Sequence, residues 1–339
     1  MKRHAMRQWA AGLTCAVAAC VAQAQPAGST DSRQAAKGAG QAYPTKSVRL
    51  VVPFSPGGTT DFIARSLGKR LSEDLGQTFV VDNRGGAGGT LGADILAKAP
   101  GDGYTLMIYH IAIATGPWLY KKLPYDVRRD IAPVTLIGSS PSIMVVNPSL
   151  NVSSVKDVIA LAKASPGRIT YGSAGIGSAG HLGPALFEYH AGVKLSHIPY
   201  KGGGPALAAA AGGEVQMMIQ VMPDTIRQVR AGRLKLLAVS TAKRVRELPD
   251  VPTIAESGVP GYEYTTWFGF FAPGTTPPAL VARLNQLVNK VLATPDVQAE
   301  FRRDGLEPSG SSVEEFRALV HSEIEKWGKV IKAAGIEPN

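Results

Sequence analysis

The sequence predicts an α/β protein of two lobes, joined by two crossing strands, with a cleft between the lobes. Three observations support this prediction. Strands and helices alternate along the chain, glycine-rich loops join a strand to a helix at four places, and two long apolar segments are suited to pass between lobes. With 339 residues, 45% of them hydrophobic, the chain has material for two compact bodies.

The first glycine-rich loop covers residues 53–61. The apolar run at 48–54 predicts a short buried strand, and residues 61–75 have the apolar spacing of a helix. This order aims the free N–H groups of a helix N-terminus at the space above the strand, where they suit a carboxylate or phosphate. An ordinary strand-to-helix turn with a Thr or Asp cap would show the same pattern.

Repetition favours the binding interpretation over the ordinary turn. Three more junctions share the design, with glycine-rich loops at residues 84–89, 172–180 and 201–204. The helices after them are expected at residues 90–98, at 181–191, and from Pro205, a favoured first helical residue. Because open α/β sheets bind ligands at the carboxyl ends of their strands, four such loops predict one shared cleft.

The alternation predicts a mainly parallel sheet, which two crossing strands interrupt at residues 137–146 and 265–273. Helices at 278–292, 295–304 and 312–334 follow, the last with a capping box of Ser312 and Glu315. We therefore expect lobe 1 to combine residues 43–141 and 265–339, and lobe 2 to consist of residues 142–264. Further elements are expected between the crossings: helix 154–163, strand 169–171, strand 197–200, strand 215–221, helix 224–231 and strand 234–240.

The N-terminus has the pattern of a secretory signal. Lys2, Arg3 and Arg7 precede an apolar stretch, and Ala22-Gln23-Ala24 fits a cleavage site, so residues 1–24 are the predicted signal peptide. Residues 25–42 predict a disordered leader. In an alternative interpretation, residues 17–20 form a lipoprotein box and Cys20 is lipidated.

Cleavage after residue 24 would remove both cysteines, Cys15 and Cys20, so no disulfide or thiol site is expected in the mature chain. The net charge would fall from +10 to +7, because three Lys or Arg residues and no acid precede the cut. A basic charge of this size is compatible with an anionic ligand or a membrane surface and proves neither.

An ordered set of motifs resembles the solute receptors of the tripartite tricarboxylate transporter family, called Bug receptors. The set covers nearly the whole mature chain. It comprises Tyr43-Pro44, the loop at 53–61, Asn83-Arg84 with Gly86-Ala87-Gly88-Gly89, residues 171–182, Pro199-Tyr200-Lys201-Gly202, residues 248–253, and Trp267 with Ala272-Pro273. The resemblance implies a periplasmic binding protein of the two-lobed, type II (Venus-flytrap) kind, which closes on a carboxylate and delivers it to a membrane permease.

The resemblance also implies that backbone amides, hydroxyls and bridging waters hold the ligand. Ligand-binding positions are then expected in both lobes, at Phe54, Ser55, Gly58, Thr59, Thr60, Asp61, Ser173, Gly177, Ser178, His181, Tyr200, Lys201 and Gly202. Asp61 would repel an anion, so we interpret it as an organiser of its loop. Lys201 would pair with a carboxylate or lie in solvent, and His181 would cap its helix or donate to the ligand. His110 follows a strand at a position that faces the cleft and is not included.

One stretch departs from the family pattern. Gln216 and Gln220 stand where acidic residues are common, and Met217, Met218 and Met222 add apolar side chains nearby. These changes favour a bulkier or more apolar acid than the family's usual ligands.

The alternative is an exported α/β enzyme that acts on a carboxylate or nucleotide. Residues 175–180 spell G-x-G-x-x-G, but the positions about twenty residues later hold Pro199, Tyr200 and Lys201 instead of an acid for a ribose. The sequence also has neither a G-x-S-x-G elbow nor a His-Glu-x-x-His site. We therefore expect a monomeric receptor without catalytic residues, metal, cofactor or nucleic-acid partner.

Overall fold

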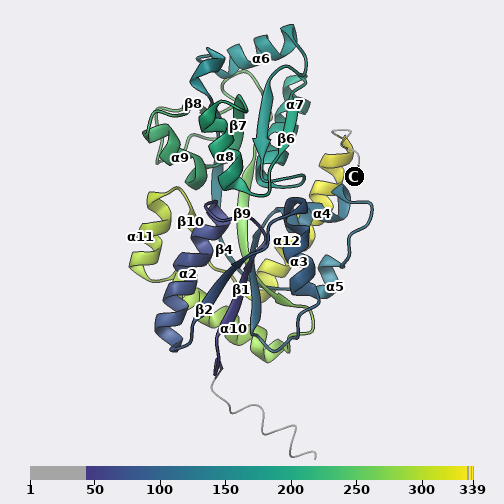
Figure 1. Ribbon diagram of the computed structural model, residues 1–339, viewed down its shortest axis with the longest axis vertical. Coiled ribbons are helices and arrows are strands. Elements are labelled where there is room, and N and C mark those ends of the chain that lie inside the picture. Colours follow the sequence, from purple (N-terminus) through teal and green to yellow (C-terminus); the bar gives the residue numbers. More distant parts are fainter. Residues whose placement is uncertain (1–42, 334–335, 337, 339) are drawn as a thin grey trace, which may run out of the picture. The chain divides into compact units, whose positions relative to one another are not determined.

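The computed structural model describes residues 43–333, 336 and 338. The predicted signal peptide (1–24) and leader (25–42) lie outside the described residues. From Pro44 onward the chain is an α/β fold on one curled mixed sheet, with strands in the order β2-β1-β3-β9-β4-β7-β5-β6 (Figure 1). The strands are β1 (Val48–Val52), β2 (Phe79–Asn83), β3 (Thr105–His110), β4 (Ile131–Val146), β5 (Thr170–Ser173), β6 (Ser196–Pro199), β7 (Met217–Val221), β8 (Lys235–Val239), β9 (Thr265–Pro273) and β10 (Glu307–Pro308).

Helices cover the sheet. They are α2 (Thr59–Leu75), α3 (Thr90–Ala97), α4 (Ala112–Leu119), α5 (Val127–Asp130), α6 (Val155–Ala164), α7 (Ala179–Ala191), α8 (Gly203–Gly212), α9 (Met222–Arg230), α10 (Pro278–Leu292), α11 (Pro295–Arg303) and α12 (Val313–Ala333), with short 3-10 turns η2 (Ala87–Gly89) and η3 (Pro148–Leu150). The predicted capping box is present at the start of α12, where Ser312 and Glu315 exchange hydrogen bonds.

Strand β4 changes partner along its length. It pairs antiparallel with β9 from Ile131 to Pro141, and from Ser142 to Val146 it pairs antiparallel with β7. The parallel set β1, β2 and β3 joins the sheet through β9, and the parallel set β5, β6 and β7 joins it through β4. This is the predicted two-lobed arrangement with crossing strands. The change of partner falls at the predicted lobe boundary of 141/142, and the boundaries themselves remain a prediction.

The central strands are buried on both faces. In β1, Val48, Leu50, Val51 and Val52 are inaccessible to solvent, and every residue of β9 after Thr265 is buried. Strands covered by helices on both sides consist of nearly continuous apolar residues, because neither face meets water. This is why short apolar runs located β1 and β9 correctly.

The structure adds elements that the sequence did not predict: α4, α5 and β10. Helix α4 is apolar on most sides and contains Pro117, so it shows no helical period. Strand β4 begins at Ile131, six residues before the prediction, because Pro133 lies beside a register shift where a strand tolerates proline. Helices α2, α7, α8 and α9 each begin two residues earlier than expected, so Pro205 is the third residue of α8 and not the first.

Gly269 in β9 gives a test of the packing between the sheet and α12. A Cβ atom at this position would lie 2.0 Å from Cζ of the buried Phe316. We expect Gly269→Ala to lower the free energy of unfolding by about 1–3 kcal/mol in urea titrations, since the ring must move in a closely packed core. Gly212→Ala is the control, because nothing lies within 4 Å of its Cβ position. Equal stability of the two variants would contradict this packing.

Candidate functional site

Four helix N-termini converge on one cavity. Helices α2, α7, α8 and α9 each follow a strand, and residues of their first turns line the cavity. None of their N-cap residues makes a side-chain capping hydrogen bond: Gly58, Ser178, Gly202 and Val221. The cavity is small, with a volume of about 20 Å³, which is room for about one water molecule. Its walls are Phe54, Gly58, Thr59, Thr60, Asp61, His110, Ala174, Ala179, Gly180, Gly203, Gln220, Val221, Asp224 and Phe268.

An aromatic wall holds His110. The Phe54 ring stacks on the imidazole at a centroid distance of 4.8 Å, and Phe268 meets it edge-on at 5.9 Å. The backbone N–H of Ala112 donates to His110 Nδ1 at 3.1 Å, so the proton of the neutral ring is on Nε2. Burial lowers the pKa of His110 to about 3, which keeps the ring neutral at physiological pH. His110 therefore offers an uncharged donor at the cavity wall.

A carboxylate joins α9 to the start of α2. The Thr59 hydroxyl Oγ1 donates to Asp224 Oδ1 at 2.5 Å, and Gln220 Nε2 donates to Asp224 Oδ2 at 2.9 Å. Burial raises the pKa of Asp224 to about 6, although the hydrogen bonds from Thr59 and Gln220 act in the opposite direction. The first turns of α2 and α9, which belong to the predicted lobes 1 and 2, are thus in direct contact beside the cavity.

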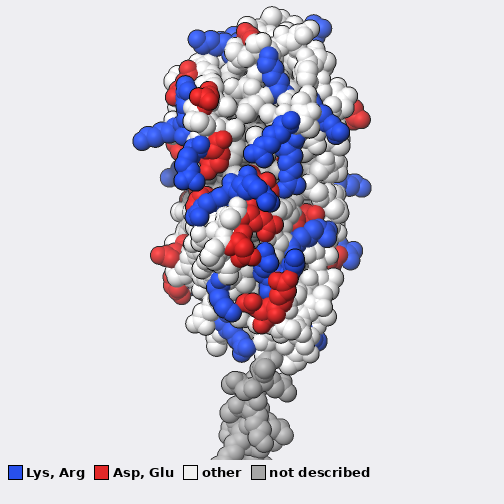
Figure 2. Space-filling view, turned by 90° about the vertical axis from the view of Figure 1, so that its left-hand side faces the viewer, with Lys and Arg blue, Asp and Glu red and all other residues white. Residues whose placement is uncertain are grey.

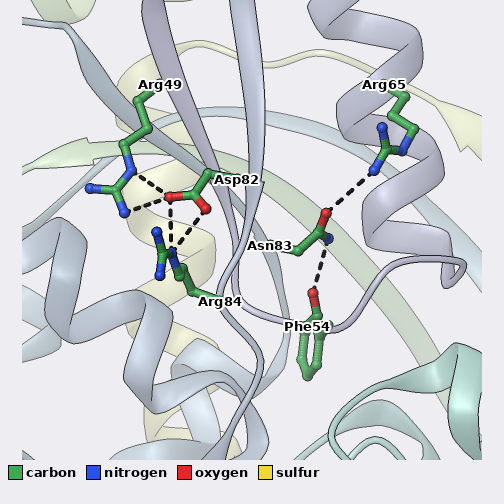
Figure 3. Close-up of polar contacts among 6 residues, drawn as sticks. All are labelled: Arg49, Phe54, Arg65, Asp82, Asn83 and Arg84. Atoms are coloured by element: carbon green, nitrogen blue, oxygen red, sulfur yellow. Dashed lines mark hydrogen bonds and ion pairs between the residues drawn. The ribbon is translucent and has the colours of Figure 1, made fainter.

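Asp61 organises its own loop. Its Oδ2 accepts from the Gly57 backbone N–H at 3.1 Å and from Arg65 Nε at 2.9 Å, and its Oδ1 accepts from Asn83 Nδ2 at 3.0 Å. Burial alone would raise the pKa of Asp61, but these hydrogen bonds hold it below the usual value. Figure 3 shows Asn83 between Phe54 and Arg65, where its amide also donates to the Phe54 carbonyl. These contacts agree with the interpretation, made from the sequence, that Asp61 organises its loop.

The loop before α7 is held by histidines. Gly177 N–H donates to His181 Nδ1 at 3.2 Å, and the His181 ring lies 4.5 Å from the His197 ring. His197 Nε2 is 2.6 Å from Ser173 Oγ. Burial lowers the pKa of His181 to about 3 and that of His197 to about 4, so both are neutral at physiological pH. The His181 side chain thus holds this loop through Nδ1, and the roles expected for it at the helix and at a ligand remain predictions.

A third contact joins the loops at the cavity rim. The backbone N–H and the hydroxyl of Ser55 donate to the Lys201 carbonyl at 3.1 and 3.2 Å. The Lys201 residue is exposed. On the face that Figure 2 shows, Lys and Arg side chains gather across the middle of the molecule, and below them they are mixed with Asp and Glu. Basic side chains are thus found on the surface, and no Lys or Arg is among the cavity-lining residues that the structure describes.

Glycines allow the backbones of different loops to meet. A Cβ atom on Gly88 would lie 1.9 Å from the Ile176 carbonyl oxygen, one on Gly85 would lie 2.6 Å from the Lys201 oxygen, and one on Gly204 would lie 2.6 Å from the Pro56 oxygen. Residues with side chains cannot approach so closely without moving the backbone. These glycines therefore permit direct contact between the two predicted lobes.

The structure divides the predicted site residues into two groups. Phe54, Gly58, Thr59, Thr60 and Asp61 line the cavity. The others lie in the loops around it and are not among its lining residues: Ser55, Ser173, Gly177, Ser178, His181, Tyr200, Lys201 and Gly202. Contact between any of them and a ligand remains a prediction.

Sequence reasoning omitted other wall residues, notably His110, Gln220, Asp224 and Phe268. Their position in the sequence could have indicated them, because His110, Gln220 and Asp224 lie at or just after the end of a strand. Phe268 lies within β9 and has no such signal. The methionines do not add to the wall as expected, because Met217, Met218 and Met222 are buried in the core instead. Gln216 also lies away from the cavity and accepts from Thr170 N–H.

Within residues 43–333, 336 and 338, no cluster of His, Cys, Asp or Glu is suited to hold a metal ion. None of the helices in this part of the chain is long and apolar enough to cross a bilayer.

Fold and cavity together define a two-lobed solute-binding protein. Residues 63–336 match the family described as "Tripartite tricarboxylate transporter family receptor", and the chain belongs to this family. BugT of Bordetella pertussis is 38% identical over 295 residues, which are 86% of this chain and 90% of BugT. A protein from the tcbD-tcbE intergenic region of Pseudomonas sp. (strain P51) is 40% identical over 291 residues, covering 86% of this chain and 87% of that protein.

Solved structures agree with this assignment. The R. palustris protein Rpa4515, solved with adipate, has a TM-score of 0.85 and 43% identity, and the alignment covers 88% of this chain and all of that one. The periplasmic binding protein BugD has a TM-score of 0.84 and 36% identity, with 88% and 100% coverage. MatC from Rhodopseudomonas palustris, solved with malate, has a TM-score of 0.80 and 31% identity, with 85% and 100% coverage.

The neutral His110 predicts an acid sensitivity. Its pKa is about 3 in the folded protein and about 6.5 in an unfolded chain, so the unfolded state gains protons as the pH falls below 6.5. The free energy of unfolding should therefore fall by about 2 kcal/mol per such histidine between pH 7.5 and pH 5. In urea titrations His110→Gln should lose about 2 kcal/mol less than the wild type over this interval. An equal loss in both proteins would contradict the buried neutral ring.

Proposed function

We propose that this protein is a periplasmic receptor that binds a small carboxylate between its lobes and delivers it to a tripartite tricarboxylate transporter permease. The observation that supports this most is the convergence of four helix N-termini, none capped by the side chain of its own N-cap residue, on one cavity. Backbone N–H groups and helix dipoles at such ends favour anions.

The wall of the cavity indicates how a carboxylate would be held. Its described residues include two acids, Asp61 and Asp224, and no Lys or Arg. Backbone amides and neutral donors such as His110 Nε2 would therefore provide the hydrogen bonds, with Phe54 and Phe268 against the carbon chain. The similar structures solved with adipate and malate support a small dicarboxylate. The proposal includes tricarboxylates as well, and the aromatic wall extends it to an aromatic acid.

The proposed lobes are residues 43–141 with 265–339, and residues 142–264. We place the ligand at Phe54, Gly58, Thr59 and Thr60 on one side and at the loop that carries Ser178 on the other. Export by residues 1–24, and a monomeric state, belong to the same proposal.

A receptor explains the G-x-G-x-x-G pattern better than an enzyme does. A Cβ atom on Gly175 would lie 2.9 Å from the Gly88 backbone nitrogen, so at least this glycine serves the close approach of two loops. No acid for a ribose follows at the required distance. The enzymatic alternative thus lacks the acidic residue that this motif needs in order to bind a nucleotide.

Isothermal titration of the mature protein tests the function. The panel contains mono-, di- and tricarboxylates of four to eight carbons, aromatic acids, and uncharged amides of the same acids. We expect saturable binding of at least one acid, no binding of its amide, and no turnover of the acid on prolonged incubation. Binding of none of the acids, or conversion of one of them, would contradict the proposal.

Ser178 provides a prediction about affinity. Its hydroxyl is buried and has no hydrogen-bond partner among the described residues, so removing it should change the unliganded protein little. If the hydroxyl binds the ligand, Ser178→Ala should weaken affinity by about 0.5–1.5 kcal/mol. Thr276→Ala is a matched control, because its buried hydroxyl is also unpartnered but lies between β9 and α10, in none of the loops that begin α2, α7, α8 and α9. Equal affinity of both variants and wild type would remove Ser178 from the site.

Gly88 provides a prediction about closure. A bound ligand should favour the closed arrangement and reduce the radius of gyration in small-angle scattering. Gly88→Ala should prevent this reduction and weaken binding, since its Cβ atom would meet the Ile176 carbonyl. Gly192→Ala is the matched control: both glycines have φ of +62°, but nothing lies within 4 Å of the Cβ position of Gly192. Normal closure of Gly88→Ala would refute the role of this contact.

A further inference from the structure

The side chain of Gln220 is a buried amide in the wall of the cavity. It lies near the end of β7, is 3% exposed, and lines the cavity. Two helix starts leave room for it: a Cβ atom on Gly180 would lie 2.6 Å from Gln220 Oε1, and one on Gly203 would lie 3.0 Å from Nε2. The side chain therefore reaches between the first turns of α7 and α8.

The orientation of this amide follows from chemistry. Gln220 Nε2 is 2.9 Å from Asp224 Oδ2, and an ionised carboxylate can only accept hydrogen bonds, so the NH₂ group faces Asp224. The oxygen Oε1 then points away from Asp224. It is buried and has no hydrogen-bond partner among the described residues. Buried acceptors without a protein partner are rare in native proteins, and their partner is commonly a water molecule, an ion or a ligand.

The neighbouring arginine side chains do not donate a hydrogen bond to Gln220 Oε1. Arg227, one turn after Asp224, forms an ion pair with Asp304 at 2.6 Å, and Arg65 forms one with Asp61 at 2.9 Å. Asp224 accepts from Thr59 and Gln220 and has lone pairs left over. Gln220 Oε1 and the Asp224 carboxylate thus form a corner of the cavity that consists of acceptors, which we call the acceptor corner.

We propose that the acceptor corner determines specificity, and that it selects acids that also bear a hydrogen-bond donor, a hydroxyl or an ammonium group. This inference rests on the proposed function, in which the helix N-termini bind the carboxylate. A donor group on the ligand would satisfy Gln220 Oε1, whereas a hydrogen atom or a second ionised carboxylate in its place would not. A site built to bind a donor rejects analogues without one, because its buried polar atoms are left unpaired.

Matched ligand pairs test the inference by isothermal titration of the mature protein at pH 7.5. Two suitable pairs differ only in a hydroxyl donor: succinate and malate, and butyrate and 4-hydroxybutyrate. A third pair, glutarate and glutamate, differs in an ammonium donor and therefore also in net charge. We expect the donor-bearing member of at least one pair to bind about tenfold tighter or better. The variant Gln220→Met, of similar length and without the acceptor, should reduce this ratio to below about threefold.

Gln228→Met is the matched control. The Oε1 atom of Gln228 is also buried and unpartnered, but Gln228 does not line this cavity, so the preference should persist. Equal binding within every pair by the wild type would overturn the inference and leave the proposed function intact. A preference that survives in a folded Gln220→Met protein would also overturn it. Binding of no acid at all would overturn the proposed function and this inference with it.

Discussion

The site depends on one continuous strand, β4, which connects two sets of parallel strands in the same sheet. β4 gives its backbone hydrogen bonds to β9 up to Pro141 and to β7 from Ser142 onward. Because the strands are buried between helices, slipping this register would expose apolar residues and leave polar backbone atoms unpaired. The shared strand thereby positions both sets, and residues that begin α2, α7, α8 and α9 line one cavity.

In the proposed function, backbone amides at helix N-termini bind the carboxylate in place of Lys or Arg side chains. Asp61 is paired with Arg65 and Asn83, Asp224 is bonded to Thr59 and Gln220, and His110 is neutral. An amide costs less to bury than a lysine, since it needs no counter-charge, and its direction is set by the helix that contains it. Glycines in these loops have no side chain, so the backbones of loops from the two proposed lobes can contact each other directly.

Much of the fold could be predicted because its signals are local. Apolar runs mark β1, β7 and β9, which are covered on both faces, and glycine-rich loops mark the junctions. The failures also have physical causes. Helix α4 is apolar without a period, and the start of β4 contains a proline that its register shift accommodates. In both places tertiary packing overrides the local preference.

By itself, the sequence determined the fold class, the order of the strands and helices along the chain except for α4, α5 and β10, the glycine-rich loops at their junctions, and the family that these motifs resemble. Only the tertiary structure decided which side chains meet. Thr59 and Asp224 are separated by 165 positions in the chain, yet they share a hydrogen bond, and Gln220 acquires its orientation from that same carboxylate. Such contacts have no local signal, because they depend on how two strand sets are joined by β4 and not on the spacing of residues along either.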